Sequence, residues 1–189
     1  MTADQFRAIL AASDRHFADL LTVLHETGMR PSEAYRLAAR DIDWQRHHAI
    51  FRHHKTSGTG EKPRVVYLTP GALELLRRLA QEHPDGPVLR NKAGTAWTRY
   101  TVARRFSRLR KQLGFGRELT ADAFRHLFIT DGLDAGIPIA TLAELAGHRS
   151  TKMIERFYGH LSERSRHLED AVNRVRPGPA PPKTEEPDT

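Results

Sequence analysis

Five residues of this chain point to chemistry, and each lies in a distinctive local sequence. They are Arg30 in TGMRPSE, Lys55 in HHKTSG, Arg125 in AFRHLF, His148 in AGHRS and Tyr158 in ERFYGH. Phosphoryl transfer requires a nucleophile, an acid for the leaving group, and positive donors placed around the phosphate oxygens. Because the set contains all three kinds of group, it predicts attack on a phosphodiester.

Each of the five side chains has a separate expected task. The planar forks of Arg30 and Arg125 would hold the two non-bridging phosphate oxygens. Lys55, on the arm of a predicted hairpin, would protonate the leaving 5′ oxygen, and His148 would bind the phosphate or accept the phenolic proton. Tyr158 would become the covalently attached group, and its phenol, with a free pKa of about 10, needs cationic surroundings.

Taken singly, these residues have simpler structural interpretations. Arg30 could pair with Glu33 or Glu26, and Tyr158 could be a core aromatic residue. Three neighbouring polar residues are candidates for contacting the phosphate or supporting the groups that do: Glu33, Asp122 and His126. His126 could equally be a core histidine. The chemical interpretation therefore depends on the set as a whole.

The elements that must position these residues are mostly helical. Apolar residues at helical spacing predict helices over about 2–11, 13–26, 31–37, 70–79, 101–113, 120–130, 138–146, 150–158 and 162–175. Segments 49–54 and 64–68, rich in β-branched and aromatic residues, predict two strands around a polar loop, with another short strand at 88–90. The sequence thus predicts a mainly α fold with a small antiparallel sheet.

Composition narrows the class of protein. The net charge of +7 favours polyanionic partners. The chain has no cysteine, which excludes disulfides, and the histidine-rich segment 47–54 lacks further ligands at metal-binding spacing, so we expect no metal. Without an apolar run of about 20 residues or a signal peptide, the expected location is the cytoplasm.

One predicted helix is unusually basic. Four of its residues recur at helical spacing: Arg104, Arg105, Arg108 and Lys111. They could contact DNA phosphates or enter a major groove, although a solvated surface helix explains them equally well. The whole of 1–176 is expected to form one domain, and the proline-rich acidic tail 177–189 is expected to be disordered.

The motifs together resemble those of the tyrosine recombinases, the phage integrase family. TGMRPSEAYRLAARDID is similar to the first-arginine block, HKTSGTGEKPRVVYLTP to the lysine hairpin, LTADAFRHLFIT to the second-arginine helix, and LAELAGHRSTKMIERFYGHL to the closing block. The resemblance implies a catalytic-domain fold of that family, with catalytic Arg30, Lys55, Arg125, His148 and Tyr158. It also implies a 3′-phosphotyrosyl link to double-stranded DNA, a four-subunit assembly on DNA, and no cofactor.

Two departures from the family pattern keep alternatives open. Asp122 occupies the position where the family usually has histidine, and its charge would repel a phosphodiester. The resemblance also starts close to Met1, without the family's amino-terminal clamp domain, so we expect weaker and more salt-dependent DNA binding. A DNA-binding module with weakened catalysis is therefore the main alternative. A tyrosine topoisomerase and a helical scaffold fit the motifs less well.

Overall fold

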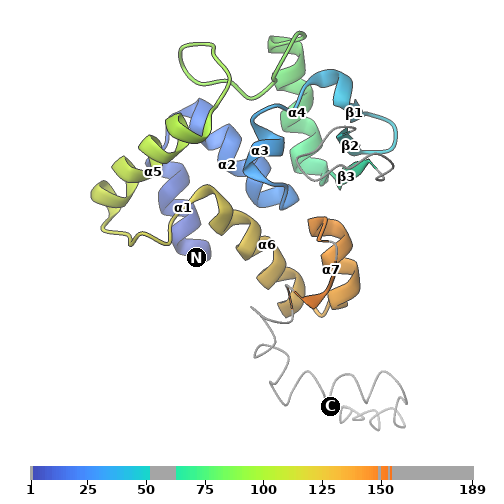
Figure 1. Cartoon of the computed structure of the whole chain (residues 1–189). Helices are drawn as coiled ribbons and strands as arrows, with labels where there is room; N and C mark the ends of the chain where they lie inside the picture. Colours follow the sequence, from blue (N-terminus) through green and yellow to red (C-terminus); the bar gives the residue numbers. More distant parts are fainter. Residues whose placement is uncertain (1, 52–62, 149, 153, 155–189) are drawn as a thin grey trace, which may run out of the picture. The chain divides into compact units, whose positions relative to one another are not determined.

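The computed structural model describes residues 2–51, 63–148, 150–152 and 154. The chain divides into two compact units, Met1–Thr151 and Lys152–Thr189, and nearly all described residues belong to the first. Along that unit the elements are α1 (Ala3–Ala11), α2 (Arg15–Thr27), α3 (Pro31–Ala34), η1 (Ala39–Asp41), β1 (Ile42–Asp43), β2 (His48–Phe51), β3 (Arg64–Tyr67), α4 (Pro70–Glu82), α5 (Arg99–Leu113), α6 (Ala121–Asp134) and α7 (Ile139–Ala146) (Figure 1). The predicted mainly α fold with a small antiparallel sheet is confirmed.

Helix α2 is the centre of the core. It packs against α6 and α4, and its residues Leu20, Leu21 and Leu24 are fully buried. Each such leucine contributes about 1.5 to 3 kcal/mol relative to an exposed one. The ring of Phe17, at the start of the same helix, lies 5.4 Å from that of Phe106 in an edge-on arrangement, which joins α5 to the core. The apolar spacing of α2 thus fixes the helices that flank it.

The sheet has three antiparallel strands in the order β1, β2, β3. Ala49 pairs with Val66 and Phe51 pairs with Arg64, so the buried positions of β2 and β3 lie opposite one another. Arg64 occupies one of these buried positions, which an alternating strand normally gives to an apolar residue. Strand β3 also contacts α7.

Several local predictions differ from the structure. The two-residue strand β1 was not among the predicted strands, because its sequence is too short to show alternation. The expected strand at 88–90 forms only an isolated bridge between Arg90 and Ala96, and α3 ends at Ala34. Most of the loop expected between the two strands, most of the two last predicted helices and the tail 177–189 lie outside the described residues. None of the described helices has the length and apolar character needed to cross a bilayer.

Candidate active site

The carboxyl end of α7 forms the frame of the site. Gly147 closes the helix in the left-handed region, with φ of 65°. Its N–H donates to the carbonyl of Glu144 at 2.9 Å, and the N–H of His148 donates to that of Ala143 at 2.8 Å. This Schellman arrangement provides hydrogen-bond donors for only some of the carbonyl groups at the end of α7. The carbonyl groups left for donors from other elements are those of Leu145, Ala146 and Gly147.

Arg125 joins the end of α7 to the end of α2. Its side chain leaves α6 and is 8% exposed. One terminal nitrogen donates to the carbonyl of Gly28 at 2.7 Å, and the other donates to the carbonyl of Ala146. Gly28 closes α2 in the left-handed region, with φ of 58°. A cation therefore lies at the negative ends of two helices, where it is electrostatically favoured.

Arg30 reaches the same turn from the start of α3, where it is the N-cap residue. It follows Gly28 by two residues, and its Nη2 donates to the carbonyl of Gly147 at 2.7 Å. Its Nη1 donates to Glu33 Oε1 at 3.0 Å, so the simple ion pair suggested by the sequence is present. The Arg30 side chain is 37% exposed, which makes it the most open cation of the site. Arg30 is thus paired with Glu33 and is still exposed enough to bind an anion.

Arg64 is a member of the site that the sequence interpretation missed. From β3, its Nη2 donates to the carbonyl of Leu145 at 2.6 Å and its Nη1 to that of Glu144 at 3.2 Å. Its Nε lies 3.8 Å from Glu33 Oε1. The available signal was an arginine at a position that strand alternation places inside. Arg30, Arg64 and Arg125, which we call the arginine cluster, thus bind four consecutive carbonyl groups of one helix end.

The arginine cluster has an excess of positive charge. Burial, together with Arg30 and Arg64, lowers the pKa of Arg125 from 12.5 to about 10. Burial also lowers the pKa of Arg64, which Glu33 opposes and Arg30 reinforces. Glu33 is 1% exposed and is the carboxylate paired with both Arg30 and Arg64. Three guanidinium groups around one carboxylate form a site suited to a further anion.

His148 follows this helix end directly. Burial lowers its pKa from 6.5 to about 4, and the positive charges of Arg125, Arg30, Arg64 and His126 act in the same direction. The imidazole is therefore neutral at pH 7 and able to accept a proton. Its Nδ1 is buried and has no hydrogen-bond partner within the described part of the chain.

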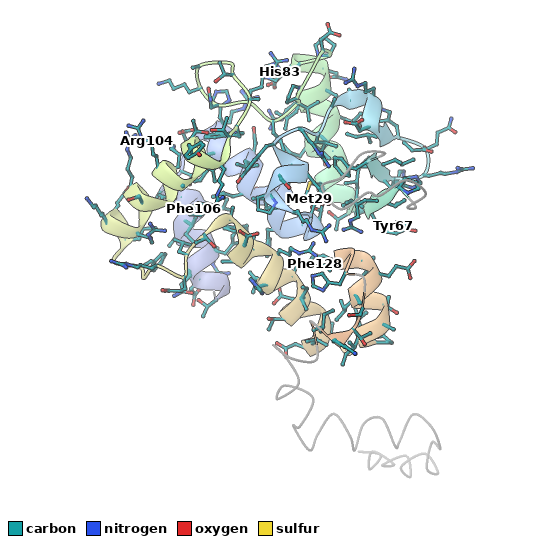
Figure 2. The ribbon with its side chains drawn as sticks, in the orientation of Figure 1. Met29, Tyr67, His83, Arg104, Phe106 and Phe128 are labelled. Carbon is teal, nitrogen blue, oxygen red and sulfur yellow. The ribbon has the colours of Figure 1, made fainter. Side chains whose placement is uncertain are left out.

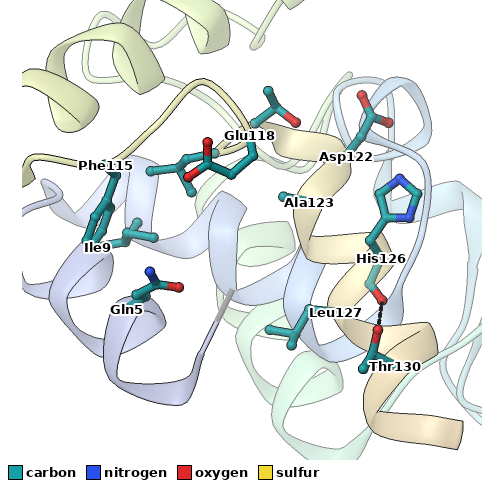
Figure 3. A pocket seen from close by; sticks show the side chains of 11 residues that line it. Gln5, Ile9, Phe115, Glu118, Asp122, Ala123, His126, Leu127 and Thr130 are labelled. Carbon is teal, nitrogen blue, oxygen red and sulfur yellow. Dashed lines mark hydrogen bonds between the residues drawn. The ribbon is translucent and has the colours of Figure 1, made fainter. Parts of the chain in front are cut away.

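Asp122 and His126 lie together on the exposed side of α6 (Figure 3). They line a hollow of about 590 Å³ whose other walls come from α1 and from the segment that leads into α6. Asp122 lies in the first turn of α6, and Thr120 is the N-cap. Burial lowers the pKa of Arg125, and the charge of Asp122 opposes part of that lowering. Burial, and after it the charge of Asp122, raises the pKa of Tyr35 to about 12. Asp122 therefore acts electrostatically on the arginine cluster.

The structure separates the basic residues of α5 into two kinds. Arg104, Arg108 and Lys111 are exposed, and Figure 2 shows Arg104 on the outer side of α5. Arg105 instead donates to Asp14, and its guanidinium lies 5.3 Å from the centre of the Phe17 ring. Arg105 thus serves the packing of α5 onto α2, and the other three form an open cationic face.

Two candidate catalytic residues, Lys55 and Tyr158, lie outside the described residues. Of the five candidate catalytic residues, the structure brings together Arg30, Arg125 and His148. It adds Arg64 to them, and Glu33 is paired with both Arg30 and Arg64. Across the described ranges, no group of three histidine or acidic residues is arranged to hold a metal ion.

Comparison with known proteins identifies what the chain is similar to. The model of the phage integrase family matches residues 1–164. An integrase/recombinase of Sinorhizobium fredii, y4eF, is 32% identical over 90% of this chain and 67% of its own length. The tyrosine recombinase XerC of Mesorhizobium japonicum is 32% identical over 75% of this chain and 46% of its own length. This chain thus spans about half to two thirds of these relatives.

A solved structure with the same fold is the Tn1549 transposon integrase in complex with circular intermediate DNA. It matches 93% of this chain and 66% of its own chain, with a TM-score of 0.74 and 19% sequence identity. At that level of identity the likeness concerns the fold.

Proposed function

The chain belongs to the phage integrase family, and from this membership we propose that it is a site-specific DNA recombinase that breaks and rejoins strands through Tyr158. The observation that carries the proposal is the arginine cluster. Arg30 and Arg125 come from distant parts of the chain and meet at the turn that presents His148. An excess of positive charge next to a neutral imidazole fits one backbone phosphate.

The chemical step follows from these groups. The Tyr158 oxygen attacks phosphorus and forms a P–O bond, while the bond from phosphorus to the 5′ oxygen breaks. His148, neutral at pH 7, accepts the phenolic proton, and Lys55 supplies a proton to the departing 5′ oxygen. The products are a 3′-phosphotyrosyl link and a free 5′ hydroxyl. Because the phosphoester energy is retained, attack by a second 5′ hydroxyl reverses the step without a cofactor.

The Tn1549 integrase structure contains DNA, and double-stranded DNA is the partner proposed for this chain. Its open cationic face on α5 supplies phosphate contacts outside the catalytic site. Strand exchange between two duplexes requires four breaks, so the proposed assembly on DNA is a tetramer of this chain. Such an enzyme would work in the cytoplasm, at the nucleoid.

The test of this function is formation of a covalent adduct. The protein is incubated with a labelled duplex that carries a nick near the cleavage site, so that the released fragment is lost. A labelled band that survives SDS and disappears after protease treatment supports the proposal. DNA binding at a specific site without such a band would contradict it and would favour a DNA-binding module of the same fold.

The position of Asp122 leads to a prediction about rate. Replacing Asp122 with histidine should raise single-turnover cleavage about tenfold, because about 1.4 kcal/mol of repulsion between carboxylate and phosphate is removed. Asp122 lies in the first turn of α6, so a small loss of stability, about 0.3 to 1 kcal/mol, should accompany the gain. Asp122→Asn separates loss of the charge from gain of an imidazole. A cleavage rate for Asp122→His at or below that of the wild type would contradict this view of the position.

The open cationic face of α5 leads to a prediction about salt dependence. The double variant Arg104→Glu, Arg108→Glu should weaken DNA binding and lower the slope of log K against log salt by about 1.8, since two phosphate contacts are lost. The measurement is a binding titration at several salt concentrations. Arg77→Glu, an exposed arginine on α4, is the matched control and should leave the slope unchanged. Equal slopes for the double variant and the wild type would exclude α5 as a phosphate-binding element.

A further inference from the structure

Arg64 has contacts that differ from those of the other two arginines. Its side chain is 7% exposed, and its terminal nitrogens donate to the carbonyls of Val65, Glu144 and Leu145. Its Nε is buried, has no hydrogen-bond partner in the described part of the chain, and faces Glu33 at 3.8 Å. Both hydrogens of Arg64 Nη1 are engaged, by Val65 and Glu144. The described bonds of Arg30 and Arg125 instead use one hydrogen of each terminal nitrogen, which leaves the other for a phosphate. Arg64 is therefore unsuited to direct contact with DNA.

The same contacts make Arg64 a support for the turn at Gly147. The Schellman bonds use the carbonyls of Ala143 and Glu144, and Arg64 binds the next one along the helix, Leu145. The Arg64 side chain also packs directly against Gly147, because a Cβ added to Gly147 would lie 2.5 Å from Arg64 Nε. The end of α7 is thus held by Arg64 through hydrogen bonds and by direct packing.

Arg64 also connects two parts of the proposed catalytic machinery. It is the first residue of β3, pairs with Phe51 of β2, and follows closely on the segment that contains Lys55. Its guanidinium reaches the turn that precedes His148. Arg64 and Leu145 are 81 residues apart in the sequence, so this hydrogen bond joins two distant regions of the chain.

From these contacts we propose that Arg64 is a positioning residue for strand cleavage, which acts by holding the Gly147–His148 turn in line with Arg30 and Arg125. The inference rests on the proposed function of the site. Loss of the Arg64 guanidinium would release the carbonyls of Glu144 and Leu145 and allow the turn to move away from the two phosphate-binding arginines.

The main test compares Arg64→Gln with the wild type. We expect single-turnover cleavage of the nicked duplex to fall about 100-fold, while the dissociation constant for DNA changes less than about threefold. Arg64→Lys keeps a cation that can bind one or two of the carbonyls, so it should recover at least about tenfold of the lost rate. Arg78→Gln, which removes an arginine bonded to Asp19 and Glu82 on the surface, is the matched control and should cleave like the wild type.

A second measurement follows the imidazole of His148 itself in the protein without DNA. Its titration, observed by NMR, should move upward in Arg64→Gln from the wild-type pKa of about 4, because one of the nearby cations is lost and the turn loosens. The other charged groups that face His148, namely Arg30, Arg125 and His126, are unchanged in this variant. Gly147→Ala should move the same signal, since a methyl group there displaces Arg64.

The outcomes separate the two proposals. Cleavage by Arg64→Gln within threefold of the wild type would overturn the positioning role, as would equal losses for Arg64→Gln and Arg64→Lys. If the wild type forms no covalent adduct, the proposed function fails. In that case the titration alone tests the role of Arg64 in holding the Gly147–His148 turn. An upward shift of the His148 signal supports that role, and an unchanged signal overturns it.

Discussion

Replacing Tyr158 with phenylalanine should remove the covalent protein–DNA adduct completely, while the affinity for duplex DNA stays within about threefold of the wild type. The change deletes only the phenolic oxygen, which is the atom that forms the bond to phosphorus. The cations that hold the phosphate are untouched, so binding should be conserved. The measurement is the yield of SDS-stable adduct on the nicked duplex, together with a binding titration.

The control for this prediction uses another tyrosine of the chain. Tyr100 is 82% exposed on α5, and its replacement by phenylalanine removes a hydroxyl of the same kind. The Tyr100→Phe variant should form the adduct at the wild-type rate. An adduct formed by Tyr158→Phe at more than a trace level would mean that a different side chain is the nucleophile.

The second large effect is expected from Arg125. Changing it to lysine should lower single-turnover cleavage by about 100- to 1000-fold, the usual loss when one donor to the developing charge is removed. Lysine keeps the charge but has a single donor group, which cannot bind Gly28, Ala146 and a phosphate together. We also expect a stability loss of about 1 to 3 kcal/mol, since a buried carbonyl loses its charged partner.

Thermal unfolding and cleavage at 25 °C should be measured on the same preparation. A protein of ordinary stability remains folded after a loss of this size, so the fall in rate would not be caused by unfolding. Arg78→Lys, which changes a surface arginine that is also hydrogen-bonded, is the matched control. A cleavage rate for Arg125→Lys within about fivefold of the wild type would remove Arg125 from the phosphate clamp.

The sequence was informative wherever a local pattern has one physical meaning. The predicted helix ends at residues 26 and 146 lie within one residue of the ends of α2 and α7, where Gly28 and Gly147 adopt positive φ at little cost. The predicted start of a helix at residue 70 is confirmed for a similar local reason, because Thr69 caps α4 before Pro70. Arg125, which was predicted to hold a phosphate oxygen, lies in an otherwise apolar segment and is buried. The motif order also predicted the family.

Contacts between distant segments could not be predicted in this way. The sequence gives no sign that the free carbonyls of α7 would be shared among three arginines, because that depends on how α2, β3 and α6 surround the helix end. Arg105 is a similar case, since its local sequence is as basic as that of Arg104, and only the position of Asp14 draws it inward. Charge spacing along a helix specifies a face, while the partner comes from another element.

By itself, the amino-acid sequence determined the set of candidate catalytic residues, the ends of the helices and the family. Each of these follows from residue types at short range along the chain. Only the tertiary structure decided that Arg64 joins Arg30 and Arg125, and that burial together with their charges lowers the pKa of His148 to about 4. The physical reason is that burial and Coulomb interaction depend on distances in space, which residues far apart in the chain acquire only when it folds.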